Sequence, residues 1–256
     1  MTGRVVFLTG ANGGIGYEIT KQFLAQPVTK LALVVAIDLH VDRLRGLLPE
    51  HEGRLEVIAG DISDRATSEA GVAAAISRSG RLDSIILNAG IQGPVGSMLT
   101  VDVAAWKRVM DINFFALVHS IQVAAPHLHK TGGTIIMTTS GVSLGPFPEW
   151  SSYGSSKAAM NYINLCWQKE DPTVRSVCVR PGIVDTGMQT AVRTELKDDL
   201  PKSTYEWLKG VHDRGELLSP DVPAKTFVYF ALKGIPDDMV STIVDYNDGR
   251  VNFDEV

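Results

Sequence analysis

Residues 5–16 read Val5-Val-Phe-Leu-Thr-Gly10-Ala-Asn-Gly-Gly14-Ile-Gly16, and an amphipathic stretch continues to about Leu24. The apolar run predicts a buried strand, the glycines a tight turn, and the stretch after them a helix. Free N–H groups at a helix N-terminus attract phosphate, and glycines let the backbone approach it closely. These residues therefore predict a phosphate-binding βα unit. The glycine spacing differs from the general dinucleotide fingerprint, so an ordinary glycine-rich turn is an alternative interpretation.

A second apolar run, residues 31–37, predicts another buried strand, which ends at Asp38. Asp38 follows Gly16 by 22 residues, close to the ~20 expected for a carboxylate that binds the hydroxyls of an adenosine ribose. Such a carboxylate repels a 2′-phosphate, and neither the glycine loop nor the position after Asp38 holds Lys or Arg. The pattern favours NAD over NADP, with NADP possible. Capping of the next helix is the alternative role of Asp38.

Further apolar runs predict strands at 55–58, 82–87, 133–139, 174–179 and 240–244, with helices at 64–79, 101–129, 151–170 and 221–232. This alternation predicts one α/β domain over residues 1–256, a doubly wound Rossmann-type parallel sheet of about seven strands with helices on both faces. Ligands bind at the carboxyl edge of such sheets. The predicted cofactor contacts there are Gly10, Asn12, Gly14, Ile15, Gly16, Asp38, Asp61, Ile62, Asn88, Ala89, Gly90, Pro181, Gly182, Ile183 and Thr186.

The composition narrows the class of protein. A hydrophobic content of 45% argues against disorder, and a net charge of -5 without a basic cluster argues against nucleic-acid binding. We expect neither a signal peptide nor a membrane span, since the apolar runs are short. Cys166 and Cys178 are expected to be reduced core residues of a cytoplasmic protein. His127 and His129 lack further ligands nearby, so no metal site is predicted.

The stretch Trp150-Ser-Ser-Tyr153-Gly-Ser-Ser-Lys157 opens the predicted helix, with Ser151 or Ser152 as its cap. Tyr153 and Lys157 are four residues apart and therefore share a helix face. An adjacent lysine cation would lower the pKa of the phenol towards a useful range for proton transfer. Ser140 ends the preceding predicted strand, where its hydroxyl would hold a substrate carbonyl. A half-buried tyrosine beside a solvated lysine is the alternative interpretation.

These motifs together resemble the short-chain dehydrogenase/reductase family over nearly the whole chain. The resemblance implies an NAD(P)-dependent oxidoreductase that moves a hydride between nicotinamide and a ketone or dicarbonyl, or the matching secondary alcohol. It implies that Tyr153 is the general acid/base and that Ser140 orients the carbonyl. It also implies that Lys157 lowers the Tyr153 pKa and binds the nicotinamide ribose, and that Asn113 anchors a water. The motifs are Thr9-Gly10-x-x-x-Gly14-x-Gly16, Asn88-Ala89-Gly90, Asn113, Ser140, Tyr153-x-x-x-Lys157 and Pro181-Gly182.

A narrower likeness is to sepiapterin reductases and fungal benzil-reductase-like proteins. It implies that Asp245 matches the late acid that holds the pteridine in the sepiapterin enzymes. Those relatives usually prefer NADPH and carry a basic residue near the glycine loop, which Asn12 and Asp38 do not match. Either NADH is used or cofactor choice is broad. The motifs are Pro146-Phe147-x-x-Trp150-x-x-Tyr153, Asp185-Thr186-x-Met188-Gln189, Gly234-Ile-Pro236 and Val244-Asp245-Tyr-Asn-Asp248.

Residues around this core predict the substrate end and the assembly. Ser140, Phe147, Trp150 and Met188 are expected to contact a small-molecule substrate, and Trp207 either joins them or packs in a lid. The charged, irregular segment 187–220 is predicted to be a mobile lid. Apolar residues on two faces of 101–129 predict a homodimer or homotetramer. Two other functions are considered: a non-catalytic dinucleotide sensor, and a nucleotide-sugar epimerase, for which the chain lacks a C-terminal substrate domain.

Overall fold

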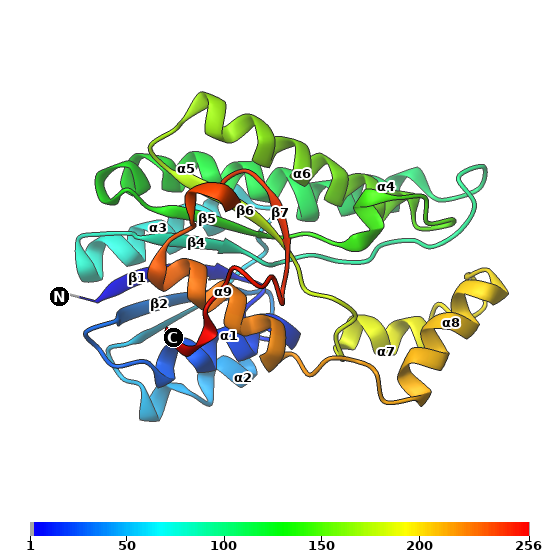
Figure 1. Cartoon of the computed structure of the whole chain (residues 1–256), viewed down its shortest axis with the longest axis horizontal. Helices are drawn as coiled ribbons and strands as arrows, with labels where there is room; N and C mark the ends of the chain where they lie inside the picture. Colours follow the sequence, from blue (N-terminus) through cyan, green and yellow to red (C-terminus); the bar gives the residue numbers. More distant parts are fainter. Residues whose placement is uncertain (1–2, 256) are drawn as a thin grey trace.

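The computed structural model describes residues 3–255, in which seven strands form one parallel sheet (Figure 1). The strand order is β3-β2-β1-β4-β5-β6-β7. Strands β2 and β3 are added on one side of β1, and β4 to β7 are added on its other side. This confirms the predicted doubly wound architecture. The strands are β1 (Arg4–Thr9), β2 (Leu31–Asp38), β3 (Leu55–Ala59), β4 (Ser84–Leu87), β5 (Thr134–Thr138), β6 (Arg175–Arg180) and β7 (Ile243–Asp245).

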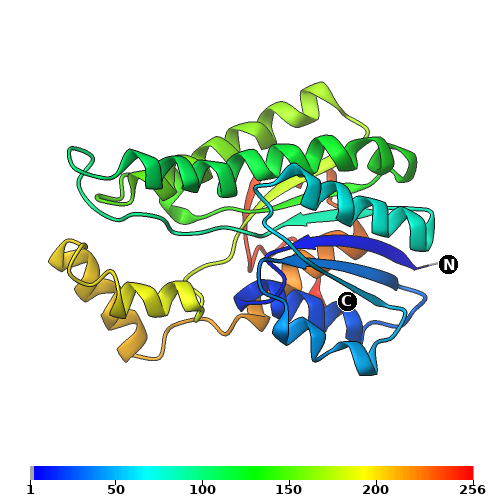
Figure 2. The same ribbon diagram turned by 180° about the vertical axis from the view of Figure 1, so that it is seen from behind.

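Helices cover both faces of the sheet (Figures 1 and 2). Helices α1 (Gly14–Ala25) and α9 (Asp221–Lys233) cover one face, and α3 (Arg65–Ser79), α5 (Ala116–Thr131) and α6 (Ser151–Glu170) cover the other. Alternate strand residues enter the two cores: Val6 and Leu8 pack on the first side, and Phe7 on the second. Burial on both faces explains why the strands read as continuous apolar runs. The short helix α2 (Asp42–Arg45) follows β2.

The predicted helix at 101–129 is real but interrupted. It consists of α4 (Val103–Met110), a π-helical turn at Asp111–Phe115, and α5. Asn113 lies in the middle of that turn, where the backbone departs from α-helical geometry. The whole 29-residue helix is long and apolar enough to cross a membrane by length and composition. Its buried residues Leu117 and Leu128 pack in the core beside the sheet, as in a core helix of a globular protein.

The segment 187–220 contains two helices, α7 (Gly187–Thr194) and α8 (Lys202–Asp213), so the prediction of an irregular segment is wrong. Each helix buries only one or two residues, among them Val192 in α7 and Leu208 and Val211 in α8. Leu208 and Val211 are three residues apart, so the apolar face of α8 was an available signal for a helix. Both helices extend from the body beside the carboxyl ends of the strands (Figures 1 and 2). The ends of the segment are joined, because Leu218 N donates to Ile183 O at 2.9 Å.

Candidate active site

The glycine loop after β1 is a close-packed backbone cradle. Gly10 and Gly14 have φ of 64° and 46°, a left-handed conformation that favours glycine. A Cβ atom on Gly16 would lie 2.0 Å from the carbonyl oxygen of Gly10, and one on Gly10 would lie 2.8 Å from Ala89 Cα. Helix α1 starts directly after this turn with its N–H groups free. A helix N-terminus behind a close-packed glycine turn suits a pyrophosphate, and the contacts of Gly10, Gly14, Ile15 and Gly16 with it stay predictions.

The ends of β1, β4 and β5 are tied together beside that cradle. The Thr9 hydroxyl accepts hydrogen bonds from the backbone N–H groups of Asn88 and Ala89, each at 3.1 Å. The Asn88 amide donates to Gly10 O at 3.0 Å and accepts from the Thr138 hydroxyl at 3.1 Å. Asn88 thus joins the carboxyl ends of three neighbouring strands next to the glycine cradle.

Asp38 contacts the glycine loop directly. Its carboxylate accepts from Asn12 N at 2.8 Å and from His40 N at 3.4 Å. Arg43 lies on the same side: it donates to Asn12 O at 3.4 Å, and its guanidinium is 3.6 Å from the centroid of the Tyr17 ring. The sequence interpretation missed this cation because it considered only the loop and the position after Asp38. A basic residue in the first turn of the following helix was the available signal.

Other predicted cofactor contacts follow further strands at the same edge of the sheet. Asp61 accepts from the Ser63 hydroxyl at 2.7 Å and from Arg108 at 2.5 Å. The hydrogen bond from Ser63 is the main cause that lowers the Asp61 pKa, so this carboxylate is ionised and already paired. A Cβ atom on Gly14 would lie 2.8 Å from the Thr186 methyl, which places the start of the α7–α8 segment against the cradle. Ile62 and Ala89 both line a small cavity next to the π-turn at Asp111–Phe115.

Pro181, Gly182 and Ile183 follow β6, where the chain leaves the sheet for α7. Gly182 has φ of 80°, and a Cβ atom there would lie 2.7 Å from the Leu218 side chain. Glycine is therefore required at position 182, because the chain that enters the α7–α8 segment there packs directly against Leu218, where the chain leaves it.

Tyr153 and Lys157 lie on the face of α6 that contacts the end of β5. Lys157 Nζ donates to Thr138 O at 2.7 Å and is 5.7 Å from the centroid of the Tyr153 ring. Ser140, whose side chain caps a 3-10 turn at Gly141–Leu144, lies close enough to the Tyr153 phenol to act on its pKa. Helix α6 begins at Ser151 without a side-chain cap, so the predicted caps are wrong. Ser152 instead donates to Pro94 O at 3.0 Å.

Burial decides the protonation of this pair. It raises the pKa of Tyr153 to about 12, although the Ser140 side chain acts in the opposite direction. It lowers the pKa of Lys157 to about 8, because the buried ammonium is poorly solvated. The sequence analysis expected Lys157 to lower the Tyr153 pKa, but in the protein without ligand burial raises it. The tyrosine is a protonated acid throughout the neutral range.

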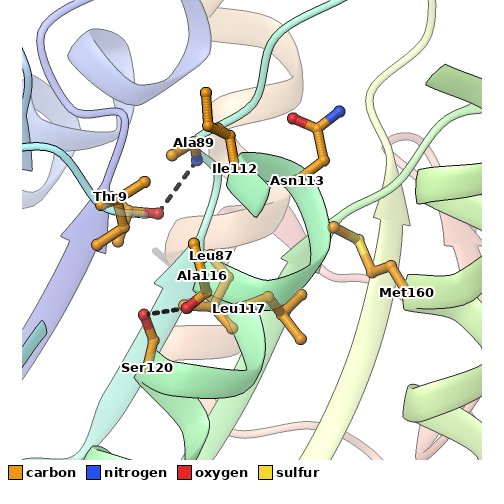
Figure 3. A pocket seen from close by; sticks show the side chains of 10 residues that line it. Thr9, Leu87, Ala89, Ile112, Asn113, Ala116, Leu117, Ser120 and Met160 are labelled. Carbon is orange, nitrogen blue, oxygen red and sulfur yellow. Dashed lines mark hydrogen bonds between the residues drawn. The ribbon is translucent and has the colours of Figure 1, made fainter. Parts of the chain in front are cut away.

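Asn113 is held through its whole amide. Its Oδ1 accepts from Ile91 N at 2.8 Å, and its Nδ2 donates to Ile91 O at 2.9 Å and to the Ser156 hydroxyl at 3.0 Å. A cavity of about 10 Å³, room for about one water, adjoins the π-turn (Figure 3). Around it, the Thr9 and Ser120 hydroxyls bond to backbone groups. The water-anchoring role of Asn113 stays a prediction.

The predicted substrate residues gather around Tyr153. Trp150, Tyr153 and Leu208 are buried in one apolar cluster, against which Phe147 and Met188 pack. The ring centroids of Phe147 and Trp150 are 5.1 Å apart, and those of Trp150 and Tyr153 are 6.2 Å apart with the planes at 90°. Trp207 of α8 extends the series, 6.1 Å from Phe147. Helices α7 and α8 thus cover the tyrosine from the side opposite the sheet.

Asp245 does not join that cluster. It ends the edge strand β7, where its carboxylate accepts from Arg180 at 2.6 Å. The carboxylate is half exposed and faces a cation of its own strand pair. A role in holding substrate therefore needs this ion pair to open.

Two buried polar side chains near the cluster have atoms without a hydrogen-bond partner within residues 3–255. They are both amide atoms of Gln92 and the indole N–H of Trp150. The segment that carries Gln92 folds onto the start of α6, since Gly96 N donates to Glu149 O at 2.9 Å. Buried unpaired groups are costly and point to a ligand or water. Gln92 lies in a loop without periodicity, so no sequence signal singled it out.

The comparisons with known proteins agree with this geometry. The model of the short chain dehydrogenase family matches residues 4–197. A benzil reductase that forms (S)-benzoin, from Saccharomyces cerevisiae, is 34% identical over 259 residues, covering 97% of this chain and 98% of that protein. A crystal structure of a short-chain dehydrogenase/reductase from the same yeast has 32% identity and a TM-score of 0.93, covering 97% and 98% of the two chains. The structure of a yeast cytoplasmic protein of unknown function has 34% identity, TM-score 0.81 and the same coverage.

Proposed function

The chain belongs to the short-chain dehydrogenase family and is an oxidoreductase that uses a nicotinamide dinucleotide, and we propose that it reduces an aryl ketone or vicinal dicarbonyl with Tyr153 as proton donor. One observation carries the proposal: Tyr153 and Lys157 lie together on the face of α6 that contacts the end of β5, and the Ser140 side chain lies within reach of the phenol. A phenol, a hydroxyl and an ammonium beside a dinucleotide site are the groups that carbonyl reduction needs.

The protonation states favour the reductive direction. When bound, the nicotinamide supplies the hydride. With a pKa of about 12, Tyr153 stays loaded with the proton that the developing alkoxide takes. The Ser140 hydroxyl donates to the same oxygen and fixes its direction, and Lys157 is available to the nicotinamide ribose. Oxidation of the alcohol would require Tyr153 to lose its proton first, which its raised pKa opposes.

Cofactor choice is proposed to be broad, with NADH favoured. Asp38 offers a carboxylate to the ribose hydroxyls and repels a 2′-phosphate. Arg43 offers a cation on the same side of the loop, fixed by its contacts with Asn12 and Tyr17. A guanidinium held over an aromatic ring is placed for phosphate recognition. The two charges would therefore allow both cofactors.

The substrate end supports an aromatic dicarbonyl. Phe147, Trp150 and Trp207 offer ring faces, which suit an aryl group. The unpaired Trp150 N–H and the unpaired Gln92 amide offer hydrogen bonds to a second oxygen. The yeast relative acts on benzil, which carries two aryl rings and two adjacent carbonyls.

We also propose a cytoplasmic homodimer or homotetramer. Phe115 of the π-turn before α5 and Tyr162 and Leu165 of α6 are large apolar side chains that are 48–68% exposed. Side by side on adjacent helices, they suit burial against a second copy. Both cysteines are free, and a yeast cytoplasmic protein shares the fold at 34% identity, which supports the compartment.

The test is Tyr153→Phe, assayed with benzil and NADH. We expect turnover to fall at least ~100-fold because the proton donor is lost, with dinucleotide binding by fluorescence titration unchanged. Tyr162→Phe, on the exposed face of the same helix, is the matched control and should keep wild-type turnover. Near-normal turnover in Tyr153→Phe would remove its assigned role. Dinucleotide binding by a wild type that reduces no ketone or dicarbonyl would favour the non-catalytic sensor.

A further inference from the structure

Three side chains on one face of α6 hold the stretch that carries Ser140. Tyr153, Lys157 and Asn161 follow one another at intervals of four residues, so they lie one above another along the helix. Tyr153 lies within reach of the Ser140 side chain, and Lys157 donates to Thr138 O. Asn161 has no part in the mechanism above, yet it contacts the same stretch.

Both ends of the Asn161 amide are used. Its Oδ1 accepts from the Thr139 hydroxyl at 2.7 Å, and its Nδ2 donates to the Ser143 hydroxyl at 2.8 Å. Asn161 is 7% exposed and Thr139 is 1% exposed, so the bond between them is shielded from water, and the bond to Ser143 is partly buried. Only an amide can accept at one end and donate at the other in this arrangement, since a carboxylate does not donate and an alkyl group does neither.

The chain of bonds continues to Ser140. The Ser143 hydroxyl donates to the Ser140 carbonyl at 2.5 Å, and Ser143 N donates to the same oxygen at 3.2 Å. The Ser140 hydroxyl accepts from Val142 N at 3.3 Å within the same turn. Asn161 therefore fixes, through Ser143, the turn that directs the Ser140 hydroxyl.

We propose that Asn161 is a positioning residue for the reaction: it sets the direction of the Ser140 hydroxyl through Ser143, without touching substrate. The inference rests on the proposed function of Ser140. A donor held by a buried network reaches the reacting oxygen without reorganisation, and misplacement by about 1 Å can cost up to about 100-fold in rate. Buried polar networks of this kind specify one geometry when every member is satisfied.

A double-mutant cycle tests the proposal on the full chain with benzil and NADH. We expect Asn161→Leu to lower kcat about tenfold with the NADH Kd unchanged, because the loosened Ser140 donor contributes less in the transition state. In a Ser140→Ala background the same substitution should change kcat less than about twofold, since the group it positions is gone. Ser143→Ala cuts the chain of bonds at another point and should repeat both results, which keeps the test valid if Asn161→Leu folds poorly.

Asn164→Leu is the matched control. Asn164 is equally buried on the same helix, but its amide donates to Thr242 O at 3.0 Å, away from the Ser140 turn. Its kcat should stay near wild type. Equal losses from Asn161→Leu with and without Ser140, or equal losses from Asn164→Leu, would show a purely structural role and overturn the inference. If Ser140→Ala itself keeps wild-type turnover, the proposed function fails instead.

Discussion

Lys157 is expected to destabilise the fold at neutral pH while serving the active site. It is 2% exposed, and burial lowers its pKa from 10.5 to about 8. The folded protein therefore binds this proton more weakly than the unfolded chain does. The resulting penalty to the free energy of unfolding is present in full below pH 8. It disappears as the pH rises from about 8 to 10.5.

The size of the effect follows from the pKa change. The difference of 10.5 − 8 = 2.5 units, at about 1.4 kcal/mol per unit, corresponds to about 3 kcal/mol below pH 8. Between about pH 7 and about pH 9.5, roughly 2 kcal/mol of that penalty disappears. In Lys157→Met the penalty is absent at every pH. The lost hydrogen bond to Thr138 O mainly shifts the stability of the variant by a constant.

Urea unfolding followed by circular dichroism measures this, with both proteins at one concentration because an oligomer unfolds in a concentration-dependent way. The free energy of unfolding of Lys157→Met relative to wild type should fall by about 2 kcal/mol from about pH 7 to about pH 9.5. Other titrating groups are common to both proteins and largely cancel. Lys202→Met, at a fully exposed lysine, should show no such slope. A pH-independent difference for Lys157→Met would refute the burial argument.

Three further substitutions test the remaining proposals. Arg43→Ala should lower kcat/KM with NADPH about tenfold, the value of one charged hydrogen bond, and leave NADH within about twofold; equal losses in steady-state assays would contradict the phosphate role. Trp207→Ala should raise KM for benzil about threefold and leave dinucleotide binding unchanged, because it removes an exposed ring contact with Phe147; an unchanged KM argues that the ring only packs in the lid. Tyr162→Glu combined with Leu165→Glu should give a monomer by light scattering, since two charges cannot be buried unpaired; an unchanged mass would place the interface elsewhere.

The sequence predicted the sheet well because its strands are buried on both faces and therefore read as apolar runs. The candidate catalytic residues could also be predicted from the sequence. Tyr153 and Lys157 share a helix face by their spacing, and Ser140 follows the neighbouring strand. Strand order then brings that strand end and that helix together. Helices α7 and α8 were missed because their buried faces hold only one or two residues, such as Val192 in α7, although the spacing of Leu208 and Val211 indicated a helix.

Features that depend on tertiary packing were beyond the sequence. Burial raises the Tyr153 pKa, and residue spacing gives no information on burial. The sequence analysis instead expected Lys157 to lower this pKa. The sequence could place Arg43 in the first turn of the helix after Asp38, but its position over the Tyr17 ring depends on how α2 packs. Asn161 is one of several polar residues on α6, and its task follows from its contact with a turn that lies eighteen residues earlier at Ser143.

The π-turn at Asp111–Phe115 carries one residue more than an α-helix needs for the same rise. Removing one codon there would let a regular α-helix cover the same rise, so α4 and α5 would keep their places while the wide turn is lost. Leu117 would still face the sheet, but the backbone that presents Asn113 to Ile91 would be gone. A shortened allele would therefore encode a stable helix without the Asn113 contact.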